Sequence, residues 1–203
     1  MNRLHHALIW AGFLAVIGVP LVLAATSPLL AWRQPIYVAA GFAGVLGMAV
    51  LLAQPLLVTG VLPGLSGLKG RRAHRWVGGL LVGLIVVHVV GLWITSPPDM
   101  IDALTFTSPT PFSPWGVIAM WAIFGAAGLA IYRARMRLPI WRIAHSALVV
   151  IVVIGSVVHA MLIEGTMEIV SKAAVSAIVL IVTGLTIAKR RAWAPFMPKR
   201  TRR

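Results

Sequence analysis

Two stretches with one shared pattern decide the fold: residues 71–92, RRAHRWVGGLLVGLIVVHVVGL, and residues 137–162, RLPIWRIAHSALVVIVVIGSVVHAML. Each begins with basic and aromatic residues and continues as an apolar run with two histidines 14 positions apart, His74 with His88 and His145 with His159. In an α-helix, 14 positions make nearly four full turns and advance about 21 Å. Both histidines of a helix therefore face the same way, one near each side of a hydrocarbon core about 30 Å thick.

The composition predicts an integral membrane protein. The 203 residues are 60% hydrophobic and only 11% charged, with a mean hydropathy of +0.95. One soluble core could not bury so much apolar surface. Runs of about 17 to 25 apolar residues predict spanning helices, and the sequence gives six candidates. These lie at 8–25, 36–61, 76–95, 115–131, 143–163 and 173–188.

The net charge of +14 is distributed unevenly between the two sides of the predicted membrane domain. One side carries 16 basic residues and no acidic ones, whereas the other carries Arg33 and Lys172 with all four acidic residues. The positive-inside rule therefore predicts that both termini are cytoplasmic. We interpret the basic charge as a topology signal rather than as a nucleic-acid site. The 16 are Arg3, Lys69, Arg71, Arg72, Arg75, Arg133, Arg135, Arg137, Arg142, Lys189, Arg190, Arg191, Lys199, Arg200, Arg202 and Arg203.

The rest of the chain predicts a single all-α domain over residues 1–203. The longest polar connection, 96–114, is rich in proline and predicts an irregular loop outside the membrane. No glycine-rich nucleotide motif follows a predicted strand, so we expect no flavin or NAD(P) domain in this chain. Cysteine is absent, which leaves histidine as the residue for any metal chemistry.

The third and fifth helices run in the same direction because one helix lies between them. His74 and His145 should therefore share the inner half of the membrane, and His88 and His159 the outer half. Imidazole is a good axial ligand for haem iron, and facing helices of a bundle commonly supply one ligand each. The pattern thus predicts an inner and an outer haem. A proton relay, hydrogen-bonded packing or a divalent-metal site are the alternatives for any one histidine.

Four cations near the predicted ligands are candidate contacts for haem propionates. Arg72, Arg75 and Arg142 lie within one turn of the inner histidines, where guanidinium groups could bind carboxylates. Positive-inside loop charge explains these arginines equally well. Lys172 precedes the sixth apolar run on the outer side, where it reaches either a propionate or the membrane surface.

The positions of glycines and tryptophans also predict local features of the helices. Gly78 and Gly155 lie four residues from a histidine and should open space for a macrocycle. Gly79 and Gly83 point elsewhere and predict a packing face against another helix. Tryptophans at the ends of the spans, Trp141 among them, predict an interfacial belt.

The two quoted stretches resemble helices three and five of the ferric reductase-like transmembrane domain family. That family includes eukaryotic ferric reductases, the membrane domains of NADPH oxidases, and the haem-binding membrane subunit of the bacterial periplasmic methionine sulfoxide reductase system. The resemblance covers the six-helix layout. It implies b-type haems, electron transfer across the membrane, and axial ligation by the four histidines His74, His88, His145 and His159.

We therefore expect a multi-pass di-haem cytochrome b of a bacterial inner membrane. It would pass electrons from a cytoplasmic flavoprotein or a quinol to an extracytoplasmic ferric chelate, reductase protein or oxygen. It would act as an electron-transfer oxidoreductase subunit or a ferric reductase-like component, with membrane lipid around it and no nucleic acid partner. The alternatives are a cytochrome b561-like quinol carrier, a histidine-lined metal permease and a structural membrane subunit. The absence of acidic residues from the spans argues against the permease.

Overall fold

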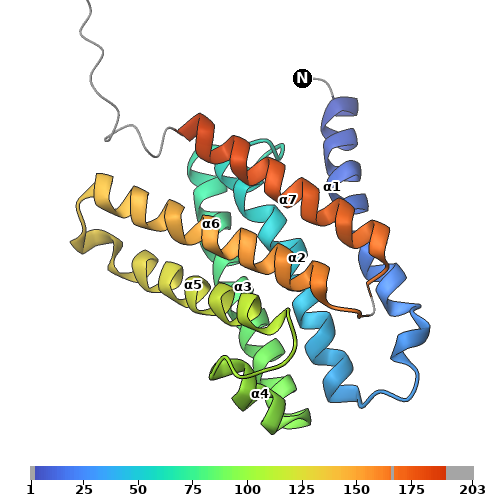
Figure 1. Cartoon of the computed structure of the whole chain (residues 1–203). Coiled ribbons are helices and arrows are strands. Elements are labelled where there is room, and N and C mark those ends of the chain that lie inside the picture. Colours follow the sequence, from blue (N-terminus) through green and yellow to red (C-terminus); the bar gives the residue numbers. More distant parts are fainter. Residues whose placement is uncertain (1–2, 166, 191–203) are drawn as a thin grey trace, which may run out of the picture.

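In the computed structural model, which describes residues 3–165 and 167–190, the chain folds into helices (Figure 1). Six of them are long and apolar enough to cross a membrane, so the chain is a multi-pass membrane protein. A short helix and two 3-10 turns lie between them. The elements are α1 (Arg3–Ala25), η1 (Pro28–Leu30), α2 (Pro35–Thr59), α3 (Gly67–Thr95), α4 (Pro97–Leu104), α5 (Ser113–Ile131), η2 (Tyr132–Arg135), α6 (Leu138–Leu162) and α7 (Ile169–Arg190).

All six predicted spans correspond to helices, and each helix begins before its apolar run, although α2 and α6 end slightly before theirs. α3 begins at Gly67, well before the apolar run at Trp76, so His74 lies within the helix rather than at its start. Lysine, arginine, leucine and alanine favour helix, and a helix can continue past the hydrocarbon core when its polar side chains meet water. The basic residues from Arg191 onward lie outside the described part of the chain.

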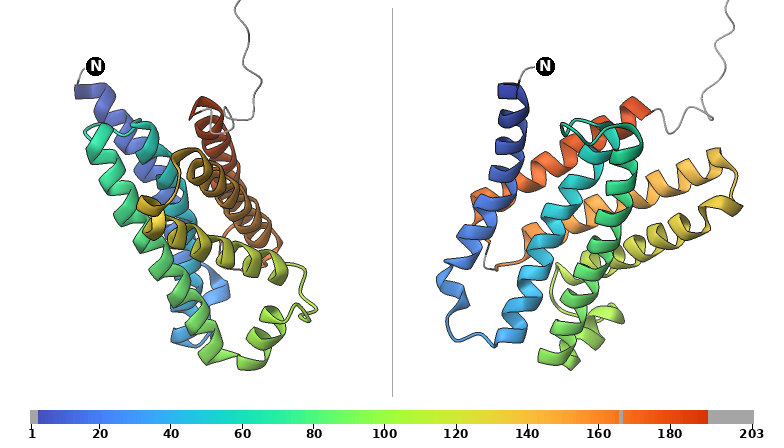
Figure 2. Two further views of the ribbon diagram at one scale, coloured as in Figure 1. Left: turned by 90° about the vertical axis from the view of Figure 1, so that its left-hand side faces the viewer. Right: turned by 180° about the vertical axis from the view of Figure 1, so that it is seen from behind.

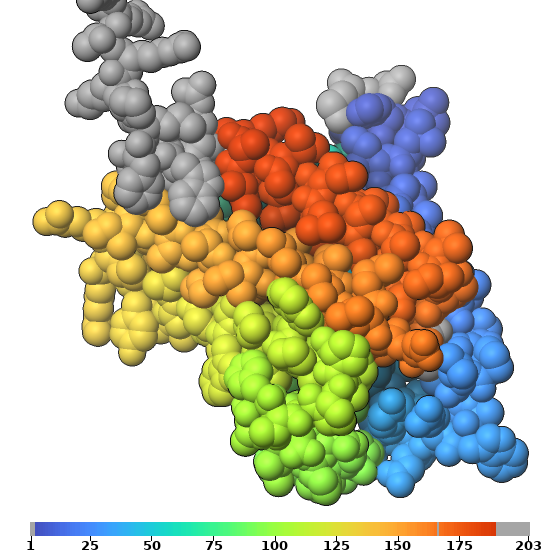
Figure 3. Space-filling model, viewed as in Figure 1, coloured from blue at the N-terminus to red at the C-terminus, as the bar shows by residue number. Residues whose placement is uncertain are grey.

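The connection predicted as irregular contains α4, so that expectation was wrong over eight residues. Pro97 and Pro98 occupy the first turn of α4, where a missing N–H costs no hydrogen bond. Asp99 also lies in that turn and accepts a hydrogen bond of 2.5 Å from the Ser96 hydroxyl. In the space-filling view this segment lies at the surface at one end of the bundle (Figure 3).

Consecutive helices form two antiparallel pairs, α2 with α3 and α5 with α6. Glycines allow close approach within each pair. A Cβ on Gly91 of α3 would lie 2.7 Å from the Cβ of Ala40, and a Cβ on Gly155 of α6 would lie 3.0 Å from the carbonyl oxygen of Trp115. α7 packs on both α2 and α6, and α5, α6 and α7 cross α1, α2 and α3 obliquely (Figure 2). By comparison, α3 and α6 approach one another little.

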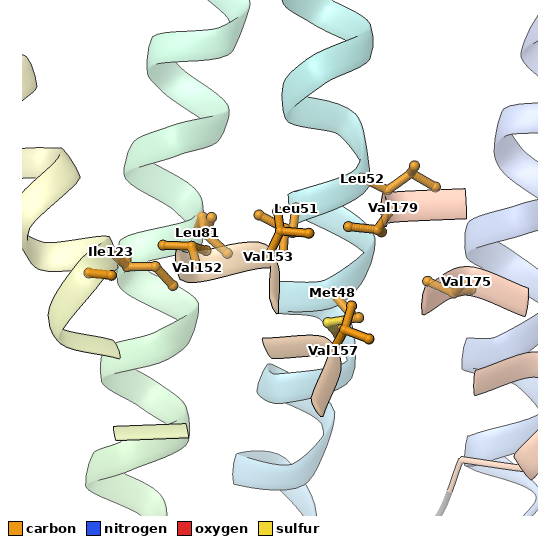
Figure 4. Close-up of a cluster of buried hydrophobic side chains, with 11 residues drawn as sticks. Met48, Leu51, Leu52, Leu81, Ile123, Val152, Val153, Val157, Val175 and Val179 are labelled. Carbon is orange, nitrogen blue, oxygen red and sulfur yellow. The ribbon is translucent and has the colours of Figure 1, made fainter. Parts of the chain in front are cut away.

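A cluster of buried aliphatic side chains joins five helices at the centre of the bundle (Figure 4). Leu51 and Leu52 come from α2, and Val179 comes from α7. Leu81 of α3 lies seven residues from both His74 and His88, and Val152 of α6 lies seven residues from both His145 and His159. Because both belong to the cluster, the two histidine levels are separated by dry, close-packed core.

Large apolar side chains also cover the outside of the bundle. Leu14 is 62% exposed, Ile94 58% and Leu185 56%. An exposed apolar surface of this extent is unfavourable in water but suits lipid. The even number of spans places the start of α1 and the end of α7 at the same end of the bundle (Figure 1).

Candidate functional site

The structure brings the four histidines together as two facing pairs. His74 of α3 faces His145 of α6 with 6.4 Å between the ring centres, and the ring planes are inclined by 80°. His88 faces His159 across the same two helices, also at 6.4 Å, with an inclination of 85°. All four side chains are partly buried. The pairing expected from helix direction is therefore present in the structure.

The spacing within each pair matches what one coordinated metal ion requires. A first-row metal binds a histidine nitrogen at about 2.0–2.1 Å, and that nitrogen lies about 1.1 Å from the ring centre, so two trans imidazoles would have centres about 6.3 Å apart. The observed separations are 6.4 Å at both levels. Since α3 and α6 themselves approach one another little, the two residues of each pair fit one flat metal macrocycle held between the two helices.

Backbone carbonyls fix the orientation of three of the rings. The Nδ1 atom of His88 donates to the carbonyl of Ala40 at 2.8 Å, and that of His159 donates to the carbonyl of Phe112 at 2.9 Å. His74 makes a longer contact of 3.3 Å with the carbonyl of Gln54. A carbonyl only accepts, so Nδ1 must carry the proton and Nε2 keeps its lone pair for a metal.

His145 is held differently. Its Nδ1 is buried and has no hydrogen-bond partner among the described residues. Instead, the ring stacks on Trp141, with 5.0 Å between ring centres and only 7° between the planes. The Trp141 indole donates to the carbonyl of Leu129 at 3.1 Å, and the guanidinium of Arg133 lies 5.0 Å from its ring centre. Trp141 is therefore part of the site, which its assignment to an interfacial belt missed.

Two glycines beside the His88–His159 pair were also not predicted from the sequence. A Cβ on Gly44 would lie 3.1 Å from Nδ1 of His88, and a Cβ on Gly116 would lie 2.6 Å from Nδ1 of His159. The signal that could have found them is the register of the antiparallel helix pairs, since each glycine belongs to the helix preceding its histidine.

The roles expected for other glycines need correction. Gly155 opens no space beside His159, because its Cα faces α5 at the Trp115 carbonyl and the Ala119 side chain. A Cβ on Gly78 would lie 3.8 Å from the amide nitrogen of Gln54, which is an ordinary contact, so the role expected for Gly78 stays a prediction. Gly79 and Gly83 were expected to pack against a helix, but a Cβ on either would meet nothing within 4 Å. The expected packing is therefore wrong for the helices of the described chain, none of which lies against these two glycines.

The candidate propionate contacts are divided between two environments. Arg72 and Arg75 are exposed at the start of α3 and line an open cavity of about 420 Å³ together with Trp76. Arg142 is exposed near His145. Lys172 is buried, and its Nζ donates to the carbonyl of Ile163 at the end of α6, at 2.7 Å. That bond satisfies a carbonyl left open at the end of a helix.

A buried amide lies beside the first pair. Neither Oε1 nor Nε2 of Gln54 has a hydrogen-bond partner among the described residues, although the backbone carbonyl of the same residue contacts His74. Within residues 3–165 and 167–190, no three histidine, cysteine, aspartate or glutamate side chains gather as a metal-binding group. The histidines thus occur strictly in twos.

Comparison with known proteins gave one family. The family model described as "Ferric reductase like transmembrane component" matches residues 11–156, which include α2, α3, α5 and three of the four paired histidines. The fourth, His159, lies just beyond the matched region. Searches of curated proteins and of solved structures found no significant match.

Proposed function

Because this chain belongs to the ferric reductase-like transmembrane family, whose members usually bind haem and serve as transmembrane electron-transfer components, we propose that it carries two b-type haems. One is held by His74 and His145, and the other by His88 and His159. The single observation that carries the proposal is the presence of two facing imidazole pairs at equal separations of 6.4 Å.

Each group contains only two histidines, and this number favours haem over a bare metal ion. A haem supplies four nitrogen ligands itself, so the protein provides only the two axial ligands. A zinc or other divalent ion held by protein alone ordinarily takes three or four protein ligands, and the described residues contain no such group. This difference also weakens the metal-permease alternative.

Bound haem supplies one-electron redox chemistry; the chain supplies ligation, orientation and spacing. The carbonyls of Ala40, Phe112 and Gln54 hold three imidazoles in the metal-binding tautomer. The buried aliphatic core lies between the two levels. Arg72 and Arg75 line an open cavity near the start of α3 and would be available to bind haem carboxylates, and Arg142 and Lys172 are further candidates.

The charge distribution supports a path that crosses a membrane. The basic ends of α3 and α6 face the cytoplasm in our proposal, as does the chain's N-terminus, which makes His74 and His145 the inner ligands. The donor is then a cytoplasmic flavoprotein or a membrane quinol, and the acceptor an extracytoplasmic protein, ferric chelate or oxygen. The membrane is a bacterial inner membrane. A b561-like quinol carrier remains the alternative assignment within the same redox class.

Haem stoichiometry tests this proposal directly. Purified protein should contain close to two haems per chain by pyridine haemochrome analysis, with the low-spin absorption and paramagnetic resonance spectra of bis-histidine iron. His88→Ala and His145→Ala should each lower the content toward one, since each removes one ligand from a different pair. Ser146→Ala, next to His145, is the matched control and should keep both haems.

Each result has a definite meaning. Protein that folds and binds no haem contradicts the proposal and favours a permease or a structural subunit. One haem per chain, with His74→Ala spectrally silent, restricts the site to His88 and His159 and contradicts the two-haem path.

A further inference from the structure

The two histidine pairs are not held equally. At the His88–His159 level both rings donate short hydrogen bonds, of 2.8 and 2.9 Å, to helix carbonyls. At the His74–His145 level one contact is longer, at 3.3 Å, and His145 has no Nδ1 partner among the described residues. The two pairs differ in the residues of α2 and α5 that lie beside the histidine rings.

Glycine occupies the same position relative to the accepting carbonyl in both helices. His88 donates to Ala40 and lies against Gly44, four residues later; His159 donates to Phe112 and lies against Gly116, again four residues later. A helix carbonyl already accepts from the N–H four residues on, as Phe112 does from Gly116 at 3.2 Å. A ring that reaches the same oxygen must pass over that fourth residue.

A side chain at that fourth residue would occupy the space of the imidazole. The Cβ of an alanine at position 116 would lie 2.6 Å from both Cε1 and Nδ1 of His159, a distance that forces the ring to move. At position 44 the corresponding distance to Nδ1 of His88 is 3.1 Å, so a smaller displacement suffices.

The other level lacks these glycines. Gln54 follows Ala40 by 14 residues, the same interval that separates His74 from His88, and Val58 stands four residues after Gln54. On α5 the equivalent position to Gly116 is Ala130. Both of these residues carry a Cβ, in keeping with the longer bond of His74 and the unbonded Nδ1 of His145.

We propose that Gly44 and Gly116 are positioning residues: they leave room for His88 and His159 to reach helix carbonyls. This pair is therefore the more firmly held of the two haem sites. The proposal rests on the proposed function where it concerns haem affinity. The part of the proposal that concerns the position of the imidazole rings does not depend on bound haem. Outer-shell hydrogen bonds to metal-binding histidines contribute about 10- to 100-fold to metal affinity.

The test compares alanine substitutions at four glycines on two helices. Gly116→Ala and Gly44→Ala should weaken retention of one haem, measured by transfer to excess apomyoglobin, with about 10- to 100-fold loss for Gly116→Ala and a smaller loss for Gly44→Ala. Gly128→Ala and Gly41→Ala are matched controls on α5 and α2, because a Cβ at either meets nothing within 4 Å. Both controls should retain two haems.

Double variants identify which haem is affected. Gly116→Ala combined with His145→Ala should lose one haem and hold the remaining one weakly, whereas Gly116→Ala combined with His159→Ala should lose no more than His159→Ala alone. Normal haem retention in Gly116→Ala, or loss that adds to His159→Ala, overturns the inference.

A haem-free measurement separates this inference from the proposed function. In haem-free protein with ¹⁵N-labelled histidine, the Nδ1–H signal of His159 should be protected from exchange and should lose protection in Gly116→Ala but not in Gly128→Ala. Protection lost as expected in a chain that binds no haem would support the positioning role and contradict the haem assignment. Protection unchanged in Gly116→Ala contradicts the positioning role whatever the haem content.

Discussion

At the scale of single residues, two different kinds of interaction orient the imidazoles. Hydrogen bonding to a carbonyl fixes both the tautomer and the ring direction, and His88 and His159 use it fully. His145 depends on contact with Trp141, four residues earlier on the same helix face. Stacking fixes the ring plane but leaves Nδ1 of His145 without a hydrogen-bond partner among the described residues, so it fixes neither the tautomer nor the full direction of the ring.

We expect Trp141 to matter for the haem at the His74–His145 pair alone. Trp141→Leu removes the flat partner of His145, so this haem should be lost more readily and its low-spin spectrum should broaden. Trp141→Phe retains an aromatic face and should restore both properties in part. Trp121→Leu is the control, since Trp121 lies on α5 and is 60% exposed. Unchanged spectra in Trp141→Leu would show that the stack has no positioning role.

The facing of the two histidine pairs was predictable because the spacing within each helix is local, whereas the groups that hold the rings were not. The spacing from His74 to His88 follows from helix geometry in one segment. The accepting carbonyl of Phe112 and the space at Gly116 depend on which helix packs behind His159 and in what register. Hydropathy gives the number of spans but carries no information about register between them.

At the scale of elements, the helix ends show how the connections are stabilised. Lys172 donates to Ile163 at the end of α6, and Glu168 caps the start of α7. The Glu168 carboxylate accepts from the N–H groups of Val170 at 2.7 Å and Ser171 at 2.8 Å. These are donors that the helix itself leaves without partners, and negative charge is favourable there. Neither interaction shows in hydropathy, just as α4 does not.

The cap on α7 should be pH-dependent. The backbone hydrogen bonds from Val170 and Ser171 hold the pKa of Glu168 below its ordinary value. A lowered pKa means that the cap contributes its full stability above the ordinary glutamate pKa of about 4.3 and loses it as the pH falls through the folded-state value. Hydrogen exchange at Val170 and Ser171, corrected for intrinsic rates, should therefore accelerate in acid.

Variants at Glu168 separate the cap from general acid effects. At neutral pH, Glu168→Gln should show intermediate protection because it keeps one acceptor oxygen, and Glu168→Ala should show the least. In both variants the acid-dependent loss of protection should largely disappear. An equal acid response in wild type and Glu168→Ala would assign the effect to another group.

At the scale of the whole molecule, two facing histidine pairs are stacked along one pair of helices, and our proposal assigns a haem to each. The histidines of each level come from α3 and α6, and Leu81 and Val152 lie midway between the levels in the aliphatic core. The ligands of the two levels are offset by about 21 Å along each helix. If each pair holds a haem as proposed, the two haems would act in sequence, and neither alone would connect both membrane faces.

Sequential transfer predicts opposite defects from the two ligand pairs. In vesicles supplied with donor at the face of the basic loops, His159→Ala should leave the haem at His74 and His145 reducible but abolish reduction of an acceptor on the other face. His145→Ala should instead block donor-driven reduction of the remaining haem. Haem content and helical circular dichroism must be measured in each variant, because loss of a ligand can unload the cofactor or unfold the bundle. If folded protein lacking the haem at His88 and His159 still reduced the opposite acceptor at the native rate, the levels would not act in series, because the remaining haem lies most of a bilayer away from that face.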